Sequence, residues 1–147
     1  MFEYDKTYEF HVNASFGDMP VDIINSLYQD GRVASKFLEI QLTSWFPELE
    51  FVDAKGYDHV CSKNARKLDA KCFTKGGLGF APSAMIGAGR KIDEQVAREH
   101  ANEIDYIACD IVNFPKIRVK FLKGSDLVKQ YPSFKIPPKH REKIFAN

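Results

Sequence analysis

Long apolar runs are absent from this sequence: none approaches the roughly 18 residues that a membrane-spanning helix needs. Residues 1–15 also lack the basic, apolar and small-residue order of a signal peptide. Both absences argue against a membrane-bound or secreted protein. We therefore expect a cytoplasmic protein of bacterial, archaeal or phage origin that makes no contact with a membrane.

Cysteine is scarce, and its number is odd. Cys61, Cys72 and Cys109 all lie within apolar segments that resemble strands. Three cysteines cannot form a complete disulfide framework, and they lack the close paired spacing of a zinc site. We expect buried free thiols, in agreement with a reducing compartment.

Internal repeats, low-complexity tracts and dividing linkers are absent as well. The 147 residues have the length of one domain, which buries about two-thirds of its unfolded surface. We expect a core over residues 33–122, preceded by an N-terminal segment, 1–32, and followed by a basic C-terminal tail, 123–147.

A large net charge is also absent, but the value of +1 hides an asymmetry. Residues 1–50 carry nine acids and three bases, whereas residues 51–147 carry eleven acids and eighteen bases. The bases concentrate in 55–75 and in 116–143. A folded chain could therefore present a basic surface to a polyanion, although solvated lysines on strand faces explain the same pattern.

Apolar periodicity predicts an α/β fold. Helical spacing indicates helices at 21–28, 33–45, 93–104 and 125–131. Alternation or continuous apolar runs indicate strands at 49–54, 57–62, 67–74, 106–112 and 116–122, with part of 2–12 as a further strand. This order predicts a mixed central β-sheet flanked by helices.

The polar residues with the most informative spacing are Asp58, Asp69 and Lys71. The turn at 63–66 would join their two strands as a hairpin, so the two carboxylates can converge. Alternation along the second strand places Asp69 and Lys71 on one face, with Leu68 and Ala70 on the other.

Tyr57-Asp58, ten intervening residues and Asp69-Ala70-Lys71 resemble the PD-(D/E)xK nuclease superfamily, which includes most type II restriction endonucleases and several resolvases. The usual proline before the first aspartate is Tyr57 here. Many members carry an acidic residue on the preceding helix, and Glu39 lies at that place. The resemblance covers about residues 33–112 and implies a restriction-endonuclease-like core with Asp58, Asp69, Lys71 and Glu39 as catalytic residues.

Two converging carboxylates would repel and become protonated unless a cation held them, so such a site calls for a divalent metal. Ligands that are all oxygen suit Mg²⁺, with Mn²⁺ as a substitute, rather than zinc. By analogy with the family, we expect Asp58, Asp69, the Ala70 carbonyl and Glu39 as ligands. The resemblance also implies cleavage of double-stranded DNA by a homodimer, and residues 1–32 are our candidate for the subunit contact.

The glycine-rich stretch 74–91 lacks both the lysine-serine ending of a phosphate loop and the spacing of a dinucleotide site. A long loop of this kind is typically functional or disordered. We expect it to contact DNA through Lys75, Arg90 and Lys91, or else to be a flexible surface loop. Lys63 and Arg66, in the hairpin turn, are further candidates for DNA contacts.

Three alternatives stay open at this stage. The same core could belong to a structure-selective nuclease such as a junction resolvase. The acids could instead be structural in a nucleic-acid-binding module without catalysis, or in a protein-interaction domain. The histidines add no second candidate: His59 should point away from Asp58, and the periodicity of its helix predicts that His100 is a core residue.

Overall fold

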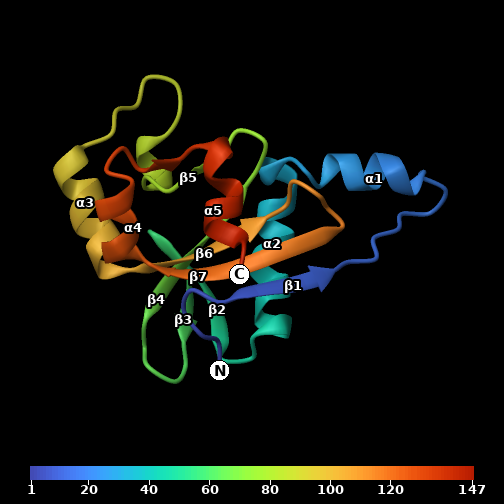
Figure 1. Cartoon of the computed structure of the whole chain (residues 1–147), viewed down its shortest axis with the longest axis horizontal. Coiled ribbons are helices and arrows are strands. Elements are labelled where there is room, and N and C mark those ends of the chain that lie inside the picture. The colour runs from blue at the N-terminus through green and yellow to red at the C-terminus, as the bar shows by residue number, and fades with distance from the viewer.

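The computed structural model describes residues 1–147 and contains one six-stranded mixed sheet (Figure 1). Its strands lie in the order β1-β7-β6-β4-β3-β2, and every neighbouring pair is antiparallel except β4 and β6. The strands are β1 (Thr7–His11), β2 (Leu49–Ala54), β3 (Tyr57–Cys61), β4 (Lys67–Phe73), β6 (Asp105–Asp110) and β7 (Lys116–Lys123). The predicted mixed α/β sheet is confirmed.

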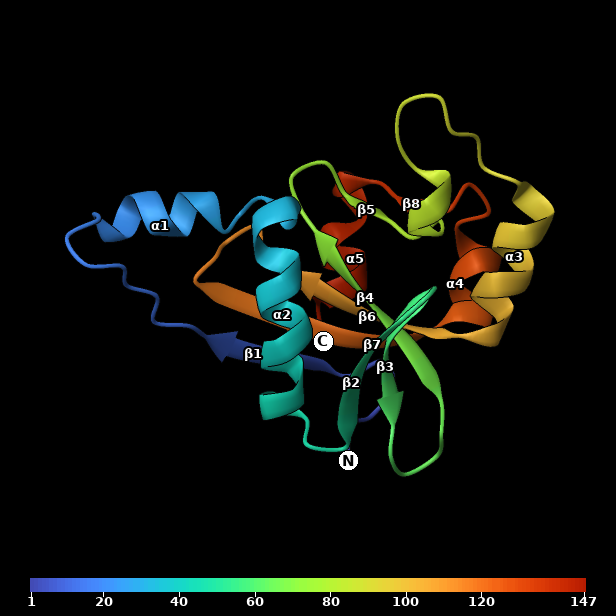
Figure 2. The same ribbon diagram turned by 180° about the vertical axis from the view of Figure 1, so that it is seen from behind.

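Helices cover both faces of the sheet. In Figure 2, α2 (Gly31–Trp45) crosses one face, and α3 (Glu94–Glu103), α4 (Gly124–Gln130) and α5 (Arg141–Phe145) lie on the other. The short helix α1 (Val21–Leu27) lies beyond the end of β1. The remaining elements are the 3₁₀ helices η1 (Ser83–Met85) and η2 (Pro138–His140) and the small pair β5 (Leu78–Gly79) and β8 (Lys135–Ile136). None of the helices combines the length and apolar character needed to span a membrane.

Two apolar cores, one on each face, hold the layers together. Because side chains alternate along a strand, Leu68 and Ile107 pack under α2, while Phe73 and Tyr106 pack under the other helices. All six residues of β6 are buried, as the continuous apolar run predicted for a central strand. The three cysteines are free thiols inside this fold, as expected.

Local sequence explains where the two long helices begin and end. The Asp30 carboxylate accepts a hydrogen bond from the Arg32 N–H at 2.9 Å and caps α2, and Pro47 follows its end. Asp93 caps α3 in the same way through the Val96 N–H at 3.2 Å. Ala34, Leu38 and Leu42 form the buried stripe that fixes the face of α2 toward the sheet.

Two segments are more ordered than the sequence predicted. The stretch 74–91 is not a loop throughout, because Leu78, Phe80 and Ala81 are buried in the core and η1 follows them. The basic C-terminal segment is folded as well, since Ile144 and Phe145 of α5 pack on the sheet. In both cases a few apolar residues provide enough buried area to fix chain that is otherwise rich in glycine or lysine.

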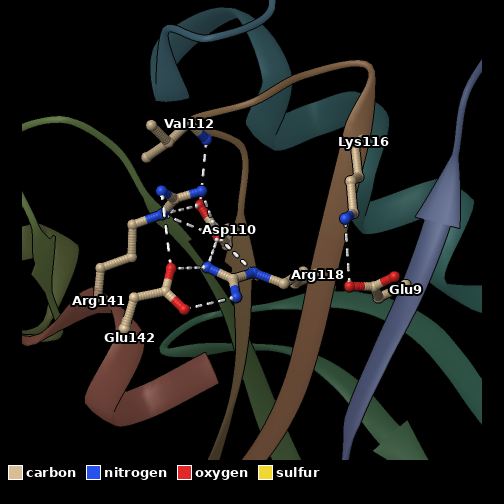
Figure 3. A network of polar contacts seen from close by, with 7 residues as sticks. All are labelled: Glu9, Asp110, Val112, Lys116, Arg118, Arg141 and Glu142. Carbon is tan, nitrogen blue, oxygen red and sulfur yellow. Dashed lines mark hydrogen bonds and ion pairs between the residues drawn. The ribbon is translucent and has the colours of Figure 1, made fainter. Parts of the chain in front are cut away.

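A buried ion-pair network attaches α5 to the sheet (Figure 3). The Asp110 carboxylate at the end of β6 accepts hydrogen bonds from Arg118 Nε at 2.9 Å and Arg141 Nε at 3.0 Å, and from the Val112 N–H at 3.1 Å. Arg118 also donates to both oxygens of Glu142, at 3.1 and 2.7 Å. The network is internally satisfied, so we assign it a structural role.

Replacing Arg141 tests this role. Arg141→Ala removes one of the two guanidinium groups from a buried carboxylate, and we expect the free energy of unfolding to fall by about 1–3 kcal/mol. Lys116→Ala is the control, because Lys116 pairs only with the exposed Glu9 and should cost less than about 1 kcal/mol. Urea unfolding of the two variants measures the difference, and equal losses would contradict a special role for Arg141.

A second buried carboxylate, Asp105, starts β6. Burial raises its pKa, but hydrogen bonds from Arg66, Tyr4 and the Gly124 N–H outweigh this effect, so the net pKa is lowered. Arg66 reaches both oxygens, at 2.9 and 2.7 Å. These bonds connect the β3–β4 turn, β6 and the start of α4.

The lowered pKa of Asp105 predicts how stability depends on pH. Its contribution is fully present above the unfolded pKa of about 3.9 and is lost as the pH falls through the lower folded pKa. Asp105→Asn should therefore be less stable than the wild type near neutral pH but lose less further stability on acidification. Urea unfolding at several pH values tests this, with the exposed Glu50→Gln as control. Parallel pH curves for Asp105→Asn and the wild type would contradict it.

Candidate active site

Strands β3 and β4 separate at the position of two aspartates. Their antiparallel register pairs His59 with Leu68 and Val60 with Lys67, and the pairing ends there. Continuing the register by one residue places Asp58 opposite Asp69. The Asp58 Oδ2 atom instead accepts a hydrogen bond from the Ala70 N–H at 3.4 Å. Both aspartates line the same two clefts, so the fold brings their carboxylates together on one side of the sheet.

The electrostatics of the pair are unfavourable for two free charges. Burial and the neighbouring Asp69 carboxylate raise the pKa of Asp58 to about 7, and the Ala70 N–H only partly opposes this rise. Burial makes the larger contribution to this rise and the Asp69 carboxylate adds to it, so the site disfavours two negative charges in the absence of a cation.

Lys71 supplies one positive charge beside the pair. Its Nζ lies 3.2 Å from Asp69 Oδ2, and both side chains are only 14% exposed. The alternation predicted from the sequence holds, because Leu68 and Ala70 pack on the α2 side of β4. In the free protein Lys71 and Asp69 therefore form a half-buried ion pair at the edge of the site.

Glu39 approaches the same site from α2. It lines a cleft of about 290 Å³ together with Asp58, Asp69, Ala70 and Lys71. Its Oε2 atom is buried and lies 3.0 Å from Lys36 Nζ, without any hydrogen-bond partner of good geometry. The Lys36 ammonium is therefore the group that neutralises this oxygen in the structure.

His59 connects the strand of Asp58 to the helix of Glu39. It points to the opposite face from Asp58, as predicted, and is fully buried. Its Nε2 hydrogen-bonds to the backbone carbonyl oxygen of Glu39 at 2.7 Å. No local pattern predicts this bond, because it joins residues 20 positions apart. It fixes the turn of α2 that carries Glu39.

A second, larger cleft of about 720 Å³ begins at the aspartates and extends to α3. His100 of α3 lines it and is half-buried, so the prediction of a core histidine was wrong. The reason is that α3 turns the Val96–His100 edge of its apolar stripe toward the cleft, while Ala97 and Ala101 face the core.

Of the five predicted DNA-contacting residues, one is held in an ion pair within the fold and four are exposed. Arg66 is engaged by the buried Asp105, and this contact favours a structural role. Lys63 lies in the hairpin turn, about 16 Å along β3 from Asp58. Lys75, Arg90 and Lys91 are exposed on the segments between β4 and α3 and are available to a ligand.

The donor set around the aspartates fits a hard divalent cation. In a strand, the N–H and C=O of one residue point toward the same neighbouring strand, so the Ala70 carbonyl faces the same gap as its N–H. Two carboxylates and a carbonyl are oxygen ligands of the kind that Mg²⁺ and Mn²⁺ prefer. The structure contains no group of three or more His, Cys, Asp or Glu side chains in a metal-ligating arrangement. Glu39, which the sequence predicted as a ligand, is therefore not brought into a ligating arrangement with the two aspartates, and the carbonyl would be the third ligand.

Searches against models of known protein families, curated proteins and solved structures gave no match for this chain. The chemistry of the site is therefore inferred from the geometry described above and from the spacing of the motif.

Cation binding can be tested without any substrate. Mg²⁺ or Mn²⁺ at about 100 times its dissociation constant should stabilise the folded state by about 2.7 kcal/mol and raise the melting temperature by about 5–10 °C. Asp69→Asn should abolish the shift, whereas Glu50→Gln, on the neighbouring β2, should keep it. Differential scanning calorimetry measures both. A shift of equal size in Asp69→Asn would show that the cation binds elsewhere.

Proposed function

We propose that this protein is a Mg²⁺-dependent DNA endonuclease of restriction type, which hydrolyses phosphodiester bonds in double-stranded DNA. The observation that carries the proposal is the convergence of Asp58 and Asp69 beside Lys71, with Glu39 entering the same cleft from the facing helix. These are the four residues of the PD-(D/E)xK pattern.

The order of elements supports the same assignment. The helix α2 precedes β2, β3 and β4, and α3 then leads to β6, which pairs in parallel with β4. This is the helix, hairpin, helix and strand order over which the sequence resembles PD-(D/E)xK nucleases. A restriction-endonuclease-like core is therefore part of the proposal.

The metal would be held by Asp58, Asp69 and the Ala70 carbonyl, with Glu39 as a further ligand. When bound, Mg²⁺ polarises the phosphate, lowers the pKa of a water molecule and screens the charge on the leaving oxygen. Mn²⁺ can replace it because both ions accept oxygen ligands in similar geometry.

The chain's own groups position the reactants. Lys71 places its ammonium beside Asp69, where it can contact the attacking water or stabilise the charge that develops on the phosphate. Glu39, at the edge of the same cleft, would orient water from the side of the facing helix. Water attacks phosphorus in line, the bond to the leaving oxygen breaks, and no covalent bond to the enzyme forms.

Binding of the duplex would use the exposed bases near the site. Lys75, Arg90 and Lys91 are suited to phosphate contacts, and Lys63 extends the basic surface along the hairpin. Cutting both strands at one place is most directly done by a two-fold dimer. We propose a homodimer whose subunit contact includes residues 1–32, where α1 exposes Val21, Ile23 and Leu27.

The proposal predicts a large loss of activity in Lys71→Ala. Removing a group that stabilises charge in the transition state typically costs a factor of about 10² or more in rate. The wild type should cut plasmid DNA with Mg²⁺ and stop when EDTA is added, whereas Lys71→Ala should bind DNA with little change and scarcely cut.

Lys67→Ala is the matched control, because Lys67 is an exposed lysine at the start of the same strand whose ammonium lies over the Tyr57 ring and pairs with neither aspartate. Its cutting rate should stay within about threefold of the wild type. DNA binding that is unaffected by EDTA and never followed by cutting would instead indicate a nucleic-acid-binding module without catalysis.

A further inference from the structure

The larger cleft beside the aspartates is not needed to hold a metal or a phosphate. It extends from Asp58 and Asp69, between the β2–β3 turn and η1, to the exposed side of α3, and its volume is about 720 Å³. A volume of this size accommodates a compact organic group and not only an ion or water. The two aspartates form the inner end of this cleft. A group bound in the cleft would therefore be only a few covalent bonds away from a phosphate held at the aspartates.

The walls of this cleft are mainly apolar. Pro82, Ala84 and Met85 from η1 form one side, and Val96 of α3, which is 48% exposed, forms another. The cation available along the cleft is Lys55 in the β2–β3 turn. A site for the phosphate backbone of a duplex would need a row of cations. Two facing apolar walls are instead suited to contact the flat faces of an aromatic ring.

One side chain can contact the polar edge of such a ring. His100 lines the cleft, and its ring nitrogens have no hydrogen-bond partner within the chain. The ring lies against Gly56, where a Cβ would come within 3.0 Å of His100 Cε1, and Gly56 has a φ of +91°. The positive φ favours glycine at this turn, and a side chain there would push the His100 ring by a few tenths of an ångström.

We propose that this cleft binds the base of an unpaired nucleotide next to the phosphodiester bond that is cut. The inference rests on the proposed nuclease function and adds the substrate class. A base inside a duplex is stacked and cannot enter a side cleft, so it must be extrahelical or lie in a single-stranded segment. DNA with a bulged or flipped nucleotide at the cut is therefore the preferred substrate.

Cleavage assays test the proposal with two synthetic duplexes that differ by one unpaired nucleotide. With Mg²⁺, we expect kcat/KM to be at least about tenfold higher for the bulged duplex, because stacking of one base accounts for a factor of this order. The cut should fall within one nucleotide of the bulge. Equal rates on both duplexes would overturn the cleft proposal and leave the nuclease function intact.

Variants of the cleft wall test whether the preference for the bulged duplex arises in this cleft. Val96→Asp places a charge on an apolar wall and should remove the preference for the bulged duplex, with cutting of the paired duplex unchanged. Val52→Asp, at another exposed valine outside the cleft, should keep the preference. Met85→Asp on η1 repeats the test in case Val96→Asp is unstable. A preference that persists in both wall variants would overturn the proposal.

A binding measurement separates failure of the cleft from failure of the nuclease. The Lys71→Ala protein is titrated into the bulged duplex with 2-aminopurine as the unpaired base, and the base fluorescence should change on transfer from water to the apolar walls. A change that Val96→Asp abolishes supports the cleft even if the wild type cuts no DNA, a result that would overturn the nuclease proposal alone. No change in fluorescence would overturn the cleft proposal.

Discussion

The proposed site depends on one interaction, the close approach of two half-buried carboxylates. Asp58 and Asp69 approach because β3 leaves β4 after two paired residues, while β4 stays paired with β6 over six. Burial first and the nearby Asp69 carboxylate second raise the pKa of Asp58, so a negative charge on both groups is disfavoured. The strand bearing Asp69 cannot relax away, because Leu68 and Phe73 anchor it in the cores on its two faces. The fold therefore imposes a charge arrangement that a cation would relieve.

The separation of the two strands also opens the site to both faces of the sheet. Lys71 and Asp69 project toward the α3 side, whereas Glu39 arrives from α2 on the opposite side. Within an intact ladder, the backbone of the neighbouring strand would keep these groups apart. The bond from His59 to the Glu39 carbonyl then sets how far α2 stands from β3. The placement of these four charged groups around one cleft thus depends on backbone topology first and on side-chain contacts second.

Much of this arrangement is local and could be predicted from the sequence. The helix α2, the hairpin and the face shared by Asp69 and Lys71 follow from periodicity within a few residues. The pairs of Asp105 with Arg66 and of Asp110 with Arg141 join residues more than 30 positions apart, and no local pattern marks them. The buried residues of 74–91 were also not predicted, because their contacts are with distant parts of the chain and the local sequence is rich in glycine. The nuclease interpretation of the four site residues stays a prediction until activity is measured.

The segment 74–91 has two parts, a beginning that is buried in the core and an end that is exposed. Phe80 is buried, donates its N–H to the Phe134 carbonyl oxygen and accepts the Tyr106 hydroxyl, so the start of the segment has a fixed position in the core. From that anchor, η1 places Met85 across the cleft from α3. The residues after η1 include Gly87 and Gly89 at positive φ and make few contacts with the core. The cleft wall therefore has a rigid base next to the aspartates and an exposed outer part. In the proposed nuclease, substitutions in the outer part would alter the shape of the cleft without moving the carboxylates.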